Sequence, residues 1–408
     1  MAFARTAPLR NELRKALPER PFSVRFWDGT ELPSTSGSTN GDGPRFTVRS
    51  PAAVGHALRA PGQLGVGRAY VTGDLEVDDI DAVMRMLDEW KPPPIDGAAK
   101  GKLALAALAA NGLALPPSPP RAELRPQGTR RSKERDARSV RHHYDLPPEF
   151  FALFLDESMT YSCAIWKYGA ETLEQAQEQK LELVCTKLGL KEGERVLDIG
   201  CGWGSFATHA ATRHGVNVVG ITLSEPQARV ARQRAIDAGV GDEVEIRVMD
   251  YRDAAAVAGE PFDAIASIGM VEHVGGENID LYAEQLAGLL PSGGRLLNHG
   301  IARLRHTDPE AGPFSERYVF PDADPLHLSR VTLALERAGF EPTLAEGFRA
   351  DYAETLRHWA RRLDENLDRA IELAGPERVR VWRLYLRAAR NGFENGFTSI
   401  FQVTAQRA

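Results

Sequence analysis

The chain has 408 residues, enough for one large domain and a smaller one, and 43% of them are hydrophobic while 26% are charged. This composition is ordinary for a folded globular protein and argues against overall disorder. The 50 basic and 56 acidic residues give a net charge of −6, so no global field favours nucleic acid as a partner.

The three cysteines, Cys163, Cys185 and Cys201, form no CxxC pair and no cluster with histidine at metal-ligand spacing. We therefore expect no disulfide framework, no metal site and a reducing cytoplasm as the compartment. The first residues lack the apolar core of a signal peptide. The most apolar segment, 103–115, is shorter than the ~20 residues that a membrane-spanning helix needs.

Two zones precede the main part of the chain. Residues 1–90 mix the strand-like runs 22–27 and 45–48 with turn signals, which predicts a small α+β domain that docks on lipid or forms a homo-oligomer. Residues 91–140 are predicted to be a Pro-rich and basic linker. Its segment 121–141 carries eight basic and three acidic residues, which fits either a solvated helix or contact with an anionic membrane surface at ~1 kcal/mol per basic residue.

Strand-like and helix-length segments alternate through residues 141–408, the predicted main domain. The apolar runs are 195–199, 216–223, 244–249, 262–268 and 295–297. This βαβα alternation predicts an α/β fold with a parallel sheet covered by helices on both faces. Two further strands, 340–348 and 399–405, flank a charged helical region at 351–390 and complete a Rossmann-like sheet of seven strands.

The most informative loop follows the first strand of this sheet. Asp198 ends the strand, and Gly200, Gly202 and Gly204 precede a helix that starts near Ser205. Glycines let backbone amides approach a ligand closely, and the helix presents free N–H groups. The GxGxG spacing differs from that of dinucleotide and phosphate loops, and the loop resembles motif I of class I methyltransferases. A tight turn without a ligand is the structural alternative.

The ends of the next two strands supply further candidates for cofactor contacts. At the second strand, where many Rossmann-type proteins carry an acid for the ribose, this chain has Thr222 and Leu223, followed by Gln227. Asp250 and Tyr251 close the third strand, where a carboxylate and an aromatic face would suit an adenine. They could equally be a surface pair.

Several motifs in order resemble cyclopropane-fatty-acyl-phospholipid synthases, a family that includes mycolic-acid cyclopropane synthases and enzymes making 10-methylene or 10-methyl fatty acids. The motifs are His142-His143-Tyr144-Asp145-Leu146, Tyr161-Ser162-Cys163-Ala164, the VLDIGCGWG loop, Gly269-Met270-Val271-Glu272-His273-Val274-Gly275 and Tyr318-Val319-Phe320-Pro321. The resemblance covers about residues 140–408 and implies S-adenosylmethionine as cofactor, with Tyr161 and Ser162 beside it.

The resemblance also implies an unusual reaction. The methyl group passes to the double bond of an unsaturated acyl phospholipid, leaving a carbocation that bound bicarbonate deprotonates. The implied bicarbonate holders are Cys163, Glu272, His299, the backbone of Ile301, and Tyr352. Their chemistry is suitable, since Glu272 and His299 can share a proton and Tyr352 can donate a hydrogen bond. Taken singly, Cys163 could be a buried apolar cysteine and His299 a core histidine. His273 is expected to point elsewhere.

One departure concerns the product. The chain has Asn298 and Gly300 around the histidine, whereas many cyclopropane synthases have leucine before it and threonine after it. The product is therefore a cyclopropane or a methylene-type branch. A methyltransferase acting on another nucleophile, and an idle binding module, are the rival functions.

Lipid access sets further expectations. The stretch 150–166 is a candidate lining for an acyl tunnel, although most of it could instead be a helix packed on the sheet. We expect a cytoplasmic enzyme that associates peripherally with membranes.

Overall fold

The computed structural model describes residues 6–35, 43–112, 115–124, 127–144, 146–257, 259–305 and 312–408. The contacts divide the chain into two compact units. The first unit comprises Met1–Leu124, Gly312–Tyr318 and Ala374–Asn391. The second unit comprises Arg125–Ala311, Val319–Leu373 and Gly392–Ala408.

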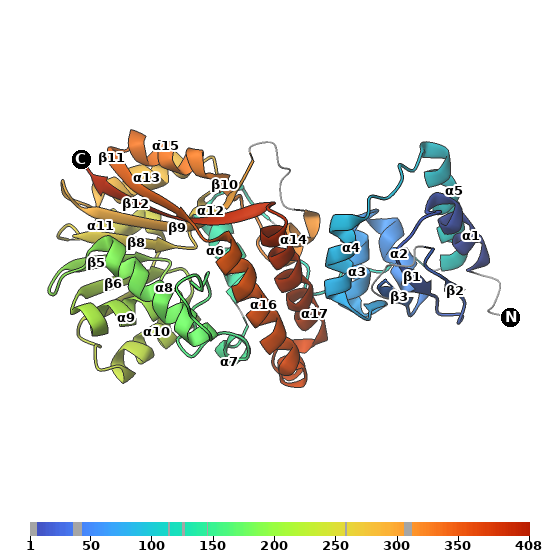
Figure 1. The fold of residues 1–408 in the computed structure, drawn as a ribbon, viewed down its shortest axis with the longest axis horizontal. Coiled ribbons are helices and arrows are strands. Elements are labelled where there is room, and N and C mark those ends of the chain that lie inside the picture. The colour runs from blue at the N-terminus through green and yellow to red at the C-terminus, as the bar shows by residue number, and fades with distance from the viewer. Residues whose placement is uncertain are drawn as a thin grey trace. The chain divides into compact units, whose positions relative to one another are not determined.

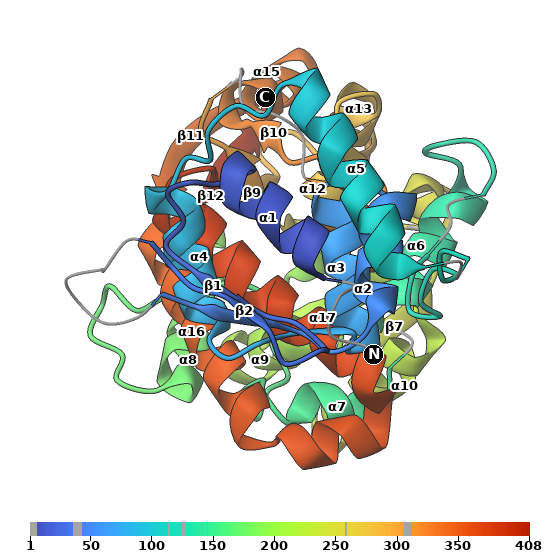
Figure 2. The same cartoon turned by 90° about the vertical axis from the view of Figure 1, so that its right-hand side faces the viewer.

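The first unit is α+β, as predicted. Its mixed sheet has the strand order β2-β1-β3-β4, with β1 and β3 parallel. Helices α1 and α5 pack side by side (Figure 2) and contribute Leu9, Ala106 and Ala110 to the core. The elements up to residue 111 are α1 (Ala7–Ala16), β1 (Ser23–Arg25), β2 (Glu31–Leu32), β3 (Arg45–Val48), α2 (Pro51–Arg59), α3 (Gln63–Thr72), β4 (Leu75–Val77), α4 (Ile80–Glu89) and α5 (Gly97–Asn111).

The division differs from the predicted domain boundaries. Helix α5 belongs to the first unit although its residues fall in the predicted linker. The first unit also takes in α14 (Pro313–Tyr318) and most of α17 (Leu367–Glu394), which kinks at Gly375 and Pro376. Arg387 and Arg390 of α17 form ion pairs with Asp81 at 3.2 and 2.6 Å. Such pairing between distant parts of the chain is not visible in local composition.

The second unit contains the predicted sheet (Figure 1), with the strand order β11-β12-β9-β8-β5-β6-β7 and β10 paired with β9. Strands β7, β6, β5, β8 and β9 are parallel, and β12 runs antiparallel to both neighbours. All seven predicted strands are present. The strands are β5 (Arg195–Ile199), β6 (Asn217–Thr222), β7 (Val244–Val248), β8 (Ala264–Ile268), β9 (Arg295–Arg303), β10 (Leu326–His327), β11 (Phe340–Gly347) and β12 (Thr398–Arg407).

Helices cover both faces of this sheet. Strand residues alternate between two cores: Val196 packs with helices α8, α9 and α10, and Leu197 packs on the other face with α13 and α15. The helical elements are α6 (Lys133–Tyr144), α7 (Pro148–Ala152), α8 (Leu173–Leu188), α9 (Ser205–His214), α10 (Glu225–Asp237), η1 (Tyr251–Asp253), α11 (Ala254–Val257), α12 (Val271–Val274), α13 (Ile279–Gly288), α15 (Leu328–Arg337) and α16 (Arg349–Glu365). None of the helices in the described ranges is long and apolar enough to cross a bilayer.

Candidate active site

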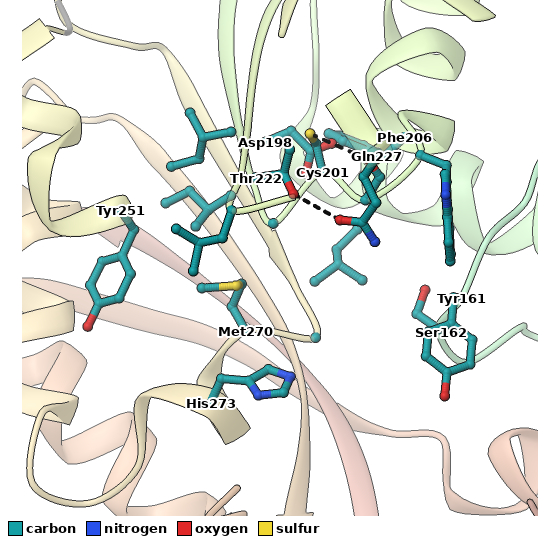
Figure 3. Close-up of a pocket in the computed structure, with 18 of the residues that line it drawn as sticks. Tyr161, Ser162, Asp198, Cys201, Phe206, Thr222, Gln227, Tyr251, Met270 and His273 are labelled. Atoms are coloured by element: carbon teal, nitrogen blue, oxygen red, sulfur yellow. Dashed lines mark hydrogen bonds between the residues drawn. The ribbon is translucent and has the colours of Figure 1, made fainter. Parts of the chain in front are cut away.

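A cavity opens where the parallel strands of the second unit end (Figure 3). Ligand sites in α/β folds lie at the carboxyl ends of the strands. Asp198 and Ile199 from β5, Thr222 from β6, Asp250 after β7 and Ile268 from β8 all line this cavity.

The glycine turn forms one wall of the cavity. Gly200, Gly202 and Gly204 have φ values of 79°, 54° and 82°, in the left-handed region that favours glycine. Gly200 and Gly202 line the cavity. Gly204 does not, because it faces α10, where an added Cβ would lie 2.8 Å from the Ala231 Cβ. Gly204 thus permits close packing of α9 on α10, and its contact with the cofactor stays a prediction.

A buried acid and a buried base lie beside this turn. Asp198 is buried, its Oδ2 has no hydrogen-bond partner, and burial raises the pKa of its carboxyl to about 7. Burial lowers the pKa of Lys180, on α8, to about 8. Lys180 also lines the cavity and donates to the Ser162 Oγ at 3.1 Å. Sequence reasoning missed Lys180 because it lies in an ordinary helix without a motif.

The end of β6 holds the predicted hydroxyl and amide together. The Thr222 Oγ1 donates to the Gln227 Oε1 at 2.9 Å, and both side chains line the cavity with Leu223 (Figure 3). The Ser224 side chain caps α10 by accepting from the Gln227 N–H. The bond to Thr222 orients the Gln227 amide so that its NH₂ remains available to a ligand.

Asp250 and Tyr251 line the cavity, as the ligand interpretation requires. The Asp250 carboxylate is also held by Arg252, whose Nε and Nη2 donate to it at 2.7 and 2.6 Å. Burial alone would raise the pKa of Asp250, but the bonds from Arg252 lower it below its usual range. The Tyr251 ring packs edge-on against Tyr282 at 5.5 Å between centroids.

Aromatic side chains close another side of the cavity. Tyr144, Tyr161 and Trp203 line it, together with Met159 and Ser162. In the stretch predicted for an acyl tunnel, Phe150, Phe151 and Phe154 are instead fully buried and pack on one another. Asp145, part of the first family motif, lies outside the described residues.

Three predicted catalytic residues gather around Phe348. The Cys163 Sγ lies 3.8 Å from the Phe348 carbonyl oxygen, which also accepts from the Tyr352 N–H at 3.0 Å. The His299 ring stacks on the Phe348 ring at 6.4 Å between centroids. All three residues are buried.

The other two predicted catalytic residues are Glu272, which lies against strand β9, and Ile301, which belongs to β9 as His299 does. The Ile301 N–H donates to the Glu272 carboxylate. Gly300 permits this approach, because an added Cβ would lie 2.1 Å from the Val271 Cγ1 and 3.3 Å from the Glu272 Oε2. Asn298 is buried and accepts from the Tyr282 hydroxyl at 3.2 Å. The departure at Gly300 thus fits the packing around Glu272, and that at Asn298 provides an acceptor for the Tyr282 hydroxyl.

The five predicted catalytic residues, called here the buried set, combine the neutral imidazole of His299 with the Glu272 carboxyl, which titrates near neutrality. Burial, with the charges of Lys180 and Lys187, lowers the pKa of His299 to about 3. Burial raises the pKa of Glu272 to about 7 and that of the Cys163 thiol well above its usual range. The His299 Nδ1 is hydrogen-bonded to the Gln402 amide at 3.0 Å, whereas the His299 Nε2 and the Glu272 Oε2 are buried without partners.

The five predicted catalytic residues lie behind the cavity wall rather than on it. None of them is among the residues that line the cavity. Met270 and His273 stand on the wall instead, so His273 points away from the Glu272 set, as expected (Figure 3). Burial lowers the pKa of His273 to about 4. The helical turn α12 thus presents His273 to the cavity and Glu272 to β9.

Part of the basic run 121–141 is engaged with acids of the second unit. Arg135 donates to both carboxylate oxygens of Asp322, at 2.6 and 2.7 Å. Lys133 pairs with Asp253 at 2.5 Å, and Arg131 donates to the His273 carbonyl oxygen at 2.8 Å. These side chains thus hold the run against the second unit, whereas Arg138 and Arg141 of the same run are exposed.

Fold and site together define a class I S-adenosylmethionine-dependent methyltransferase: a parallel sheet with one reversed strand, β12, and a glycine turn on a cavity at the strand ends. Residues 131–403 match the family described as mycolic acid cyclopropane synthetase. The chain therefore belongs to this family of methyltransferases and cyclopropane synthases, as its motifs indicated.

Full-length relatives support this membership. The chain is 37% identical over 411 residues to a probable fatty acid methyltransferase of Mycobacterium tuberculosis, covering 97% of this chain and 93% of that protein. It is 33% identical over 380 residues to the cyclopropane-fatty-acyl-phospholipid synthase of Escherichia coli, covering 92% of each. The solved mycolic acid cyclopropane synthase CmaA1, complexed with SAH and CTAB, superposes with a TM-score of 0.62 at 32% identity, covering 66% of this chain and 98% of that one.

Proposed function

We propose that this enzyme transfers the methyl group of S-adenosylmethionine to the double bond of an unsaturated fatty-acyl chain of a phospholipid, giving a methylene-type or cyclopropane product. When bound, S-adenosylmethionine supplies an electrophilic methyl group on a positively charged sulfur. The wall residues fit this cofactor, since Gly200 and Gly202 leave room for close approach and the Asp198 Oδ2 is buried without a partner.

The observation that carries the proposal is the pair of buried, partnerless atoms beside β9. The Glu272 Oε2 and the His299 Nε2 lack hydrogen bonds, and polar atoms in the interior rarely do unless a ligand or water satisfies them. A small anion such as bicarbonate would satisfy such groups if Glu272 or the anion carries a proton. Bicarbonate there would supply a proton acceptor, held by Glu272, His299, Cys163, Tyr352 and the Ile301 backbone.

The residues themselves explain why such a site suits an alkene. A double bond is a weak nucleophile, so it must be aligned with the methyl donor and shielded from water. Aromatic side chains such as Tyr144, Tyr161 and Trp203 exclude water from the cavity. The protonatable set lies apart from the cofactor wall, where it can accept a proton after methyl transfer.

The test uses purified enzyme, isotope-labelled S-adenosylmethionine and vesicles of an oleoyl phospholipid, with mass spectrometry of the released acyl chains. A mass gain of one CH₂ on the acyl chain is expected. Catalytic hydrogenation then separates the products, since an exocyclic methylene takes up hydrogen and a cyclopropane resists it. Label found only on an added alcohol or amine substrate would overturn the proposal in favour of another methyltransferase activity.

We also propose that the first unit brings the enzyme to an anionic lipid surface. Helix α5 exposes Leu105 and Leu108 one turn apart, with Lys100 and Lys102 exposed in its first turns. Apolar side chains flanked by lysines suit the boundary between acyl chains and anionic headgroups. Co-sedimentation with anionic vesicles should exceed that with zwitterionic vesicles and should fall in Leu105→Gln/Leu108→Gln. Unchanged vesicle binding together with loss of a homo-oligomer would assign this face to dimerisation instead.

A further inference from the structure

Two neighbouring helices of the second unit bring together metal-binding side chains that the proposed reaction does not use. Cys185, His209 and His214 each offer one ligand atom, and these atoms all lie within 4.8 Å of one another. Cys185 lies on α8, and the two histidines lie on α9, His214 at its last residue. Cys185 is buried, and both histidines are mostly shielded from solvent.

A carboxylate lies beside the two histidines of the cluster. Glu182 lies one turn before Cys185 on α8, and its Oε2 is 3.2 Å from the Nε2 of His209 and 3.2 Å from the Nε2 of His214. In a tetrahedral zinc site, metal–ligand distances of ~2.0–2.1 Å separate nitrogen and oxygen ligand atoms by roughly 3.3 Å. Both separations in the cluster thus match those of two imidazoles and a carboxylate on one ion.

We propose that Glu182, Cys185, His209 and His214 form a binding site for a zinc-class divalent cation. One thiolate, two imidazoles and one carboxylate are the ligand types that Zn²⁺ takes in four-coordinate sites. Magnesium and calcium prefer all-oxygen ligands, so this set selects against them. An ion can enter from an open hollow bordered by Glu178, Glu182, His209 and Arg213.

The location points to a structural role. None of the four residues lines the cofactor cavity, yet both helices border it. Lys180, on α8, lines the cavity, and α9 begins directly after the glycine turn. An ion shared by α8 and α9 would fix the two helices on which Lys180 and the turn depend.

The sequence alone predicted no metal site, because Cys185 is far from both histidines along the chain. Packing of α8 against α9 supplies the proximity that the spacing lacks. Without a metal, the Glu182 carboxylate would simply accept a hydrogen bond from each imidazole. Experiment separates these two arrangements.

The decisive probe is Co²⁺ added to the metal-free full-length protein. We expect one equivalent to bind, with the strong visible absorption of tetrahedral cobalt and a thiolate-to-cobalt charge-transfer band in the near ultraviolet. Zn²⁺ should displace the cobalt and raise the melting temperature by on the order of 5–10 °C at saturation. None of these readouts requires turnover.

Matched variants localise the site. Cys185→Ser should remove the charge-transfer band, and His214→Gln, at a partly exposed helix end, should weaken Co²⁺ binding at least tenfold. Cys163→Ser and His358→Gln are the controls: the first removes another buried thiol, and the second removes another histidine that contacts a carboxylate, that of Glu354 at 3.3 Å.

Both controls should bind cobalt like the unaltered protein. The melting curve of each metal-free variant shows that it is folded. Absence of stoichiometric binding to the unaltered protein, or a charge-transfer band that persists in Cys185→Ser, would overturn the proposal.

Discussion

The cofactor wall and the buried set behind it are built differently, although both belong to the second unit. The wall depends on a continuous turn, where Asp198, Gly200 and Gly202 lie within five residues of one another. The buried set is assembled from four separate segments, which carry Cys163, Glu272, Tyr352 and, on β9, both His299 and Ile301. On the wall the side chains of Thr222 and Asp250 have polar partners and the Asp198 Oδ2 has none. The buried set has two partnerless atoms, the Glu272 Oε2 and the His299 Nε2.

This difference separates two tasks. A wall with a fixed backbone conformation, on which Asp198 keeps one unsatisfied atom for a ligand, suits recognition of one cofactor. A buried set with unsatisfied groups is costly unless a ligand completes it, so it suits proton transfer. Perturbing each region should therefore affect a different observable: cofactor affinity for the wall, and turnover for the buried set.

The largest expected effect is on turnover in Glu272→Gln. The variant retains the shape of the side chain but removes its capacity to hold or release a proton, so the rate should fall by about 10²–10⁴-fold. Binding of S-adenosylmethionine, measured by calorimetry, should change little. Glu277→Gln is the control, because Glu277 is exposed in the same region. Full activity in Glu272→Gln would remove Glu272 from the mechanism.

Glu272→Gln should stabilise the folded protein although it lowers turnover, and this gain in stability should depend on pH. Burial raises the pKa of Glu272 from 4.5 to about 7, so the folded chain holds this proton more tightly than the unfolded chain does. That stabilisation is present below pH 4.5 and is lost as the pH rises through about 7.

Glutamine never ionises, so Glu272→Gln should match the unaltered protein in acid. Above about pH 8 it should be more stable by on the order of 3 kcal/mol. Denaturant unfolding of both proteins across this range measures the difference. If the difference in unfolding free energy between the two proteins is constant with pH, Glu272 does not titrate in the folded state.

Local sequence signals predicted the fold well. Seven of the eight described strands of the main sheet could be predicted from apolar runs and their spacing, because each strand is continuous in sequence. The eighth, β10, has only two residues and gives no such signal. The unit boundaries could not, since Asp81 pairs with Arg387 and Arg390 on a helix about 300 residues later. The basic run 121–141 could likewise be found by counting charges along the sequence, but its acidic partners Asp253 and Asp322 could not.

The site shows the same limit. Ten of the eleven predicted cofactor residues line the cavity, and Gly204 is the exception, since only the structure shows that its space is filled by Ala231. Lys180 and His273 were missed because whether a helical side chain points toward a cavity depends on how the helix packs. The roles of the buried set came from family resemblance and remain predictions.

A smaller effect, on the affinity for S-adenosylmethionine, is expected in Gly200→Ala, which alters the cofactor wall. Gly200 has φ 79°, and an added Cβ would lie 2.7 Å from the Met270 Cγ, so Met270 must move into the cavity it lines. The affinity for S-adenosylmethionine should fall by about 10–100-fold, given strain of order 1–3 kcal/mol. Gly202→Ala is the matched control, because its φ is 54° and nothing lies within 4 Å of an added Cβ. Equal losses in both variants would mean that backbone strain alone, and not Met270, limits binding.

The smallest expected effect tests the hydrogen bond at the end of β6. Thr222→Val keeps the branched shape but removes the donor to the Gln227 Oε1, leaving that amide free to rotate. A net contribution of about 0.5–1.5 kcal/mol for such a bond predicts a 2–10-fold loss of S-adenosylmethionine affinity, with turnover at saturation unchanged. Thr222→Ser, which retains the hydroxyl, should restore most of the affinity. If valine instead lowers turnover at saturating cofactor while affinity is unaffected, the wall is not confined to recognition, and the contrast with the buried set fails.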